Sequence, residues 1–330
     1  MNTRMRAWTG RILKAVIVVA ITWGLFRATG LDLAQIDMAE IERLNPSGGL
    51  MVLSFVGLVA MYLWHAMLWR RIVTELSSCT LTRRRTIRVY FLANLGKYIP
   101  GKFWQVAGLA VLAGRAGVQP VVAVASALLG QLAFLVAGLA IVTALVPGAL
   151  DLGPLLWLAL AAMILAGGIY AVRHLAPVQR IVAGLGPRFV EPLRDLARVA
   201  AEIRVPQVTV WFVAYLATWL LLGAAFTVFV SAFVPLGGVS AFPRLAGIMA
   251  ASYLAGYVAI IAPAGVGVRE GVMGLLLAQL MPAPAAVIVA VASRIWFTLA
   301  ELAPVAAIPF LDRKTDPSGE EQRSERLVAL

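Results

Sequence analysis

Long apolar runs set the strongest limit on how this chain can fold. The run from Pro120 to Leu145 contains no charged residue, and runs of similar character recur along the sequence. About 18–20 apolar residues suffice for a helix to cross the hydrocarbon core of a bilayer, which is roughly 30 Å thick. Hydrophobic residues make up 61% of the chain and charged residues 13%, whereas soluble domains carry about 25% charged residues. We therefore expect an all-α polytopic membrane protein.

The positions of the basic residues predict the orientation of the spans. Arginine and lysine collect in residues 1–14, between Arg70 and Arg88, and at Arg313 and Lys314. Cytoplasmic loops of membrane proteins carry such an excess, so we expect both termini on the cytoplasmic side of the cytoplasmic (inner) membrane. This distribution also accounts for the net charge of +12, and no nucleic-acid partner is expected.

The apolar runs predict about six full spans and two re-entrant hairpins, or about eight spans if the second hairpin crosses fully. The transmembrane domain should cover residues 1–311, followed by a disordered cytoplasmic tail at 312–330. Full spans are expected at about 12–29, 49–69, 120–145, 154–172, 208–230 and 285–310, with the hairpins at about 87–117 and 243–281.

The first hairpin is predicted from a break inside apolar sequence. Pro100 and Gly101 lie between Lys97 and Lys102. Proline removes a backbone donor and glycine tolerates unusual dihedral angles, so a turn forms readily there. Irregular backbone at membrane depth is tolerated only where protein or a water-filled cavity surrounds it. We expect the tip of a re-entrant hairpin at Pro100 and Gly101.

A second break of the same kind occurs near the C-terminal end of the chain. Pro263, Gly265 and Gly267 precede the adjacent charges Arg269 and Glu270, again within apolar sequence. An apolar helix has no use for a helix breaker and a charge in its middle. The pattern predicts a second hairpin tip at Pro263 to Gly267.

The order span, broken hairpin, span occurs twice, at 49–145 and at 208–310. The first span of one unit should run inward and that of the other outward, which makes an inverted repeat. Paired Gly/Pro-interrupted segments at corresponding positions are the sequence signal of a transporter's binding site near the bilayer midplane. The two breaks should therefore contribute to one site.

Charged residues at membrane depth indicate what this site binds. Arg294 and Glu301 lie on one face of the last span, whereas Arg269 and Glu270 are adjacent and should project about 100° apart. A charge in the middle of a span is costly, so it usually faces a partner or a cavity. We expect Glu270 to pair with Arg294 and Arg269 to face a cavity. A closed ion-pair network of all four residues, which only fixes helix packing, is the alternative.

Lys97 and Lys102 would add positive charge to a site that contains Arg269. Arginine suits forked recognition of phosphate or carboxylate, so these residues predict an anion site for a lipid headgroup, completed by Glu270, Arg294 and Glu301. Tyr98, Trp104 and Gln105 are expected to line the cavity, although anchoring of the hairpin at the interface is an alternative for the aromatic residues. His65 and Gln131 are further candidates for the interior.

No catalytic or metal site is expected. The chain has one cysteine, Cys79, and two histidines, His65 and His174, which offer neither a disulfide nor a metal cluster. No nucleophile with an identifiable base stands out, and no cofactor is expected.

Three motifs carry a family resemblance. These are Leu95-Gly-Lys-Tyr-Ile-Pro-Gly-Lys-Phe-Trp-Gln-Val-Ala-Gly, Ala262-Pro-Ala-Gly-Val-Gly-Val-Arg-Glu-Gly and Ala292-Ser-Arg-Ile-Trp-Phe-Thr-Leu-Ala-Glu. In this order they resemble the transmembrane domain of lysylphosphatidylglycerol synthetases, which also occurs as a stand-alone bacterial protein. In bifunctional members this domain is assigned to lipid flipping, while a separate soluble domain performs aminoacyl transfer.

The resemblance implies a lipid flippase that acts on a phosphate-bearing or anionic lipid. Because the residues after 310 leave no room for the soluble domain, we do not expect aminoacyl-phospholipid synthesis. The expected partners are membrane lipids and a separately encoded lipid-modifying enzyme, and the oligomeric state stays open. The alternative function is an intramembrane glycosyl- or lipid-modifying transferase, or an accessory subunit of one.

Overall fold

The computed structural model describes residues 45–77, 79–98, 103–145, 195, 198–199, 202–259 and 265–313. Within these ranges the regular elements are eight α-helices and two short 3-10 helices, and no strand is present. The spans expected at 12–29 and 154–172 lie outside the described residues, as does the tail from residue 314 onward. The helix that precedes the tail ends at Arg313.

Four of the described helices are long and apolar enough to cross a membrane. They contain 26 to 31 residues, which at 1.5 Å per residue gives about 39–46 Å. Each includes one of the expected spans and is as long or longer. All-α polytopic membrane architecture is thereby confirmed. The four helices are α3 (Gly48–Leu76), α6 (Pro120–Leu145), α10 (Val205–Phe233) and α13 (Ala283–Arg313).

The remaining helices are short and form two packed pairs, α4 with α5 and α11 with α12. Their 10 to 17 residues give about 15–26 Å, less than the roughly 30 Å of a span. These lengths fit re-entrant hairpins. The bounds are α4 (Arg83–Asn94), the 3-10 helix η2 (Leu95–Tyr98), α5 (Phe103–Arg115), the 3-10 helix η3 (Gly238–Ala241), α11 (Phe242–Val258) and α12 (Val268–Leu277).

The first hairpin begins earlier than its apolar pattern predicted. Its arginine-rich start, Arg83 to Arg85, lies before the predicted boundary at about residue 87, yet it forms the first turn of α4. The side chain of Thr82 caps this helix by accepting a hydrogen bond from the backbone N–H of Arg85. Arginine is a good helix former, so hydrophobicity alone placed the boundary too late.

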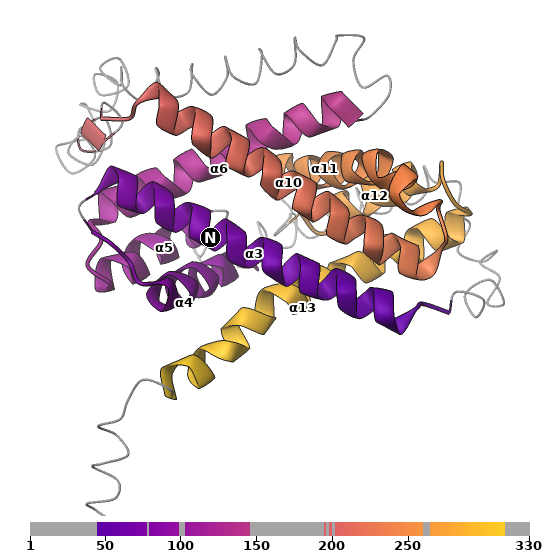
Figure 1. The fold of residues 1–330 in the computed structure, drawn as a ribbon, viewed down its shortest axis with the longest axis horizontal. Helices are drawn as coiled ribbons and strands as arrows, with labels where there is room; N and C mark the ends of the chain where they lie inside the picture. The colour runs from indigo at the N-terminus through magenta and orange to yellow at the C-terminus, as the bar shows by residue number, and fades with distance from the viewer. Residues whose placement is uncertain are drawn as a thin grey trace, which may run out of the picture.

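The two central helices, α3 and α10, lie side by side and antiparallel (Figure 1). At one end of the pair the backbone N–H of Ser47 donates to the carbonyl of Ala232 at 2.9 Å. At the other end Trp211 Nε1 donates to the carboxylate of Glu75 at 2.7 Å. Because α4 follows the end of α3 and α11 follows the end of α10, the two hairpins lie at opposite ends of this pair, as Figure 1 shows.

The two halves of the described fold share one order of α-helices: a long helix, two short helices and a long helix. We call α3 to α6 the first unit and α10 to α13 the second unit. Their contacts correspond as well: α6 packs on α10 and α11, and α13 packs on α3 and α4. Tyr62 of α3 packs edge-on against Phe297 of α13, and Trp219 of α10 stacks on Phe134 of α6. Each of these four rings stands equally far from the start of its helix.

The antiparallel pairing of α3 and α10 predicts a specific cross-link. A Cβ atom on Gly57 would lie 3.5 Å from Ala225 Cβ, within the Cβ separation of a disulfide. In a Cys79→Ser background, Gly57→Cys with Ala225→Cys should therefore form a disulfide on mild oxidation, detected as loss of two thiols to maleimide-polyethylene glycol labelling.

The matched control joins Gly57→Cys to Ala214→Cys. Ala214 lies eleven positions from Ala225, about 16 Å along the helix axis, so this pair should stay reduced. Cross-linking of the control but not of the first pair would contradict the antiparallel arrangement.

Candidate anion site between the hairpin tips

A cavity of about 200 Å³ lies where the two hairpins approach each other. Lys97 and Tyr98 of η2 line it from the first hairpin, and Gly265 and Arg269 line it from the second. The long helices α3, α6, α10 and α13 and the short helices α4, α5 and α11 supply the remaining walls. Residues next to the two sequence breaks thus line one cavity, although they are far apart along the chain.

Helix α13 has a polar face that lines the cavity and an apolar face that is exposed. Arg294, Thr298 and Glu301 line the cavity, and spacings of three and four residues place them on one side of the helix. The other side is apolar and exposed, which suits contact with lipid chains. Its exposed side chains are Val291, Ile295, Leu299 and Leu302.

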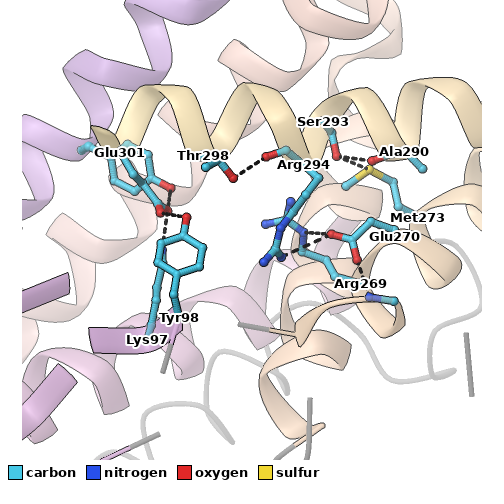
Figure 2. Close-up of polar contacts among 12 residues, drawn as sticks. Lys97, Tyr98, Arg269, Glu270, Met273, Ala290, Ser293, Arg294, Thr298 and Glu301 are labelled. Carbon is cyan, nitrogen blue, oxygen red and sulfur yellow. Dashed lines mark hydrogen bonds and ion pairs between the residues drawn. The ribbon is translucent and has the colours of Figure 1, made fainter. Parts of the chain in front are cut away.

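Glu301 attaches the tip of the first hairpin to α13 (Figure 2). Its carboxylate pairs with Lys97 Nζ and accepts hydrogen bonds from the hydroxyls of Tyr62 and Tyr98, the last at 2.6 Å. The Glu301 side chain is only 4% exposed. Three donors compensate this buried carboxylate, because bonds to an ionised acceptor are stronger than neutral ones.

Glu270 has a structural role at the tip of the second hairpin. Its Oε2 accepts a hydrogen bond of 2.7 Å from the backbone N–H of Gly267, the residue before α12. This is the reciprocal half of a capping box. Its Oε1 lies 3.5 Å from Arg294 Nη1 and 3.5 Å from Arg269 Nε. Glu270 therefore caps the start of α12 and contacts two arginines.

Glu270 pairs with Arg294 and Arg269 lines the cavity, as expected, but the contact between Arg269 and Glu270 was not expected. Adjacent residues were expected to point about 100° apart. The long Arg269 side chain instead turns back toward its neighbour, as Figure 2 shows. The helix fixes the directions of the two Cβ atoms, but the flexible side chain of Arg269 can still bend back toward Glu270.

Arg269 is the least satisfied charged residue of the cavity. Its side chain is 8% exposed, and its Nε and Nη2 have no hydrogen-bond partner among the described residues. The 3.5 Å separation from Glu270 is an ion-pair contact without hydrogen-bond geometry. Its guanidinium carbon lies 4.3 Å from the ring centroid of Phe297, a favourable cation–π contact. Buried donors of this kind are rare in folded proteins.

Two glycines allow Arg269 to occupy this position. A Cβ on Gly256 of α11 would lie 2.9 Å from Arg269 Cβ, and one on Gly265 would lie 2.8 Å from the Gly256 carbonyl oxygen. Gly265 also has a φ of 69°, in the left-handed region that favours glycine. The second tip therefore packs directly on the backbone of α11.

The charged residues form two groups rather than the closed four-residue network considered above. Glu301 binds Lys97 of the first hairpin, whereas Glu270 contacts Arg269 and Arg294. Among the described residues of the two groups, three cations face two carboxylates. These described residues therefore carry one net positive charge.

The other predicted site residues are placed as follows. Gln105 lines the cavity and donates a hydrogen bond of 2.8 Å to Asn94 Oδ1. Trp104 was expected to line the cavity, but it lies outside this lining with a 43% exposed side chain on α5. It neighbours Gln105 in the chain and hence projects to another side of the helix. Lys102, Pro100, Gly101 and Pro263 lie outside the described residues.

His65 and Gln131 line the cavity as expected, but the sequence analysis missed the tyrosines. Besides Tyr98 and Tyr257, four tyrosines from four helices line the cavity, and one of them binds Glu301. A tyrosine in the middle of an apolar span was the available signal, since a buried hydroxyl usually needs a partner. These residues are Tyr62, Tyr90, Tyr215 and Tyr253.

The Lys97–Glu301 pair predicts a pattern of stabilities. Glu301→Gln leaves Lys97 as a buried charge without its counterion and should lower the free energy of unfolding by about 3–5 kcal/mol, whereas removing both charges of a buried pair is often nearly neutral. Lys97→Met with Glu301→Gln should therefore recover most of the loss, measured as the unfolding midpoint in detergent.

The control is Arg71→Gln, which removes a 55% exposed ion pair with Glu75 and should cost less than about 1 kcal/mol. A double variant less stable than Glu301→Gln alone would contradict the pairing.

Comparison with known proteins agrees with this architecture. The family model described as "Lysylphosphatidylglycerol synthase TM region" matches residues 11–300. No curated protein matches the chain. The match includes both hairpins and Arg294 of α13, ends one residue before Glu301, and covers most of the chain. The chain therefore belongs to the lysylphosphatidylglycerol synthase transmembrane region family.

Proposed function

We propose that this protein binds the phosphate group of a phosphate-bearing or anionic lipid and moves that lipid across the cytoplasmic membrane. The observation that carries the proposal is the state of Arg269. It is buried, it lines the cavity, and its Nε and Nη2 lack hydrogen-bond partners among the described residues. A planar guanidinium with free donors suits the oxygens of a phosphate group.

The charge balance of the site supports a singly charged ligand. The three cations Lys97, Arg269 and Arg294 face the carboxylates of Glu270 and Glu301. A phosphodiester carries one negative charge and would balance the remaining positive charge. Neutrality matters here because an uncompensated charge at membrane depth costs several kcal/mol.

The N-terminus of α12 supports the same ligand. Arg269 lies in the first turn of this ten-residue helix, and Gly265 before it lines the cavity. The first N–H groups of a helix and its dipole both favour an anion. Glu270 caps Gly267 and leaves the rest of this positive end available to a ligand.

The size of the cavity indicates which part of a lipid enters it. Drug-sized ligands occupy about 300–1,000 Å³, whereas this cavity measures about 200 Å³. A headgroup fits such a volume, and the acyl chains would remain among lipid chains outside. The exposed apolar face of α13 offers a surface for those chains.

The arrangement of the hairpins supports translocation over simple binding. They lie at opposite ends of the antiparallel α3–α10 pair, and their tips meet at the cavity. Transporters built from inverted units place their site where discontinuous helices meet and expose it alternately to each side. A separately encoded enzyme that makes or uses the lipid is the partner we propose.

The test replaces Arg269 in reconstituted vesicles. Arg269→Gln should slow the transfer of phosphatidylglycerol bearing a fluorescent acyl chain at least tenfold, because a hydrogen bond to a charged group contributes about 1.5–3 kcal/mol. Transfer is read from dithionite quenching of the outer leaflet. The unfolding midpoint should change little, because Glu270 keeps Arg294 as its counterion and the variant removes a buried guanidinium whose Nε and Nη2 lack hydrogen bonds.

Arg244→Gln is the matched control, since it removes an exposed arginine from the start of α11. Fluorescent glucosylceramide, which has no phosphate, should move no faster with the protein than without it. Undiminished transfer by Arg269→Gln would contradict the site assignment. Vesicles in which the unmodified protein moves no lipid would contradict translocation, and a lipid product formed during the assay would favour the transferase alternative.

A further inference from the structure

A second buried donor without a partner faces the same cavity. Gln131 of α6 lines it, and its Nε2 has no hydrogen-bond partner within the described structure. Asn94 and Gln105, the other amides of the lining, bond to each other at 2.8 Å. Gln131 therefore stands apart from them, and such a group calls for an explanation.

Aromatic side chains, including a tyrosine hydroxyl, lie beside the part of α6 that carries Gln131. A Cβ on the preceding residue, Gly130, would lie 2.7 Å from the hydroxyl of Tyr215, so this hydroxyl approaches α6 next to Gln131. Phe134 lies one turn further along the same face, and its ring lies 5.1 Å from that of His65. Lys97, Arg269, Arg294 and Glu301, the described charged residues of the lining, come from the hairpin tips and α13.

The two units place Gln131 and Arg294 at corresponding positions. Each stands equally far from the start of its helix, α6 or α13, and each precedes by three residues the phenylalanine that packs on the other unit. The cavity therefore has two related walls: the wall of the second unit carries an arginine where the wall of the first unit carries an amide.

We propose that the ligand headgroup has two parts: a phosphodiester bound at Arg269 and an uncharged hydroxyl-bearing group, a sugar or polyol, bound at Gln131. This rests on the proposed function. An ammonium group only donates hydrogen bonds and cannot satisfy the N–H groups of Gln131, whereas a hydroxyl both donates and accepts and satisfies the amide in either orientation. Nor does the described lining offer a free carboxylate to an amine, because Glu301 already binds Lys97 and two tyrosines.

Native mass spectrometry of the full-length protein with three phospholipids of identical acyl chains tests the inference. Phosphatidylinositol carries hydroxyls, phosphatidylethanol carries only an ethyl group and phosphatidylethanolamine carries an amine, and all three are phosphodiesters. We expect phosphatidylinositol to bind about tenfold more tightly than the other two, a difference of about 1.4 kcal/mol.

Gln131→Leu should abolish the preference for phosphatidylinositol, so that it binds about as tightly as phosphatidylethanol. The affinity for phosphatidylethanol should stay unchanged. Tyr215→Phe should reduce the same preference, and it provides a second variant if Gln131→Leu does not fold. Gln279→Leu, at an exposed glutamine in the turn after α12, should behave as the unmodified protein.

The outcomes separate this inference from the proposed function. Equal binding of the three lipids, or a full preference in both Gln131→Leu and Tyr215→Phe, overturns the hydroxyl subsite. If Arg269→Gln still loses affinity for all three lipids in that case, the anion site stands. Binding of no lipid by the unmodified protein overturns both.

Discussion

The site depends on how a buried carboxylate is compensated at membrane depth. Glu301 sits in an apolar helix, and its charge is tolerated because Lys97, Tyr62 and Tyr98 all turn toward it. A charge in the middle of a span costs several kcal/mol without such partners. The same contacts hold the tip of the first hairpin against α13. The contacts that compensate the charge of Glu301 therefore also fix one wall of the cavity in place.

The two units share an architecture but differ in chemistry. Their rings correspond across α3, α6, α10 and α13, and each last helix packs on the other unit. Arg294 in the second unit stands where the first has the neutral Gln131. A common backbone arrangement can therefore present a charged wall and an uncharged wall to one ligand. Symmetry of the fold does not require symmetry of the site.

The sequence predicted the coarse fold well because membrane thickness is a strong constraint. Run length identified four of the long helices, and Pro/Gly breaks identified the hairpins. Side-chain contacts were harder to predict. Nothing in the spacing of Lys97 and Glu301 shows that they meet, because that contact depends on how the first hairpin packs against α13. The exposure of Trp104 and the return of Arg269 toward Glu270 depend on rotation and on flexible stems, which a hydropathy pattern does not contain.

The two ion-pair groups differ in which parts of the fold they join. Arg269, Glu270 and Arg294 all belong to the second unit, whereas Lys97 and Glu301 connect the first unit to the second. A movement of one unit against the other would leave the arginine cluster intact and would have to separate Lys97 from Glu301. The affinity for an anion and the barrier to such a movement would then be set by different residues. Transport rate could therefore change on joint replacement of Lys97 and Glu301 by neutral residues, which leaves the net charge of these described residues unchanged, while the headgroup remained equally well bound.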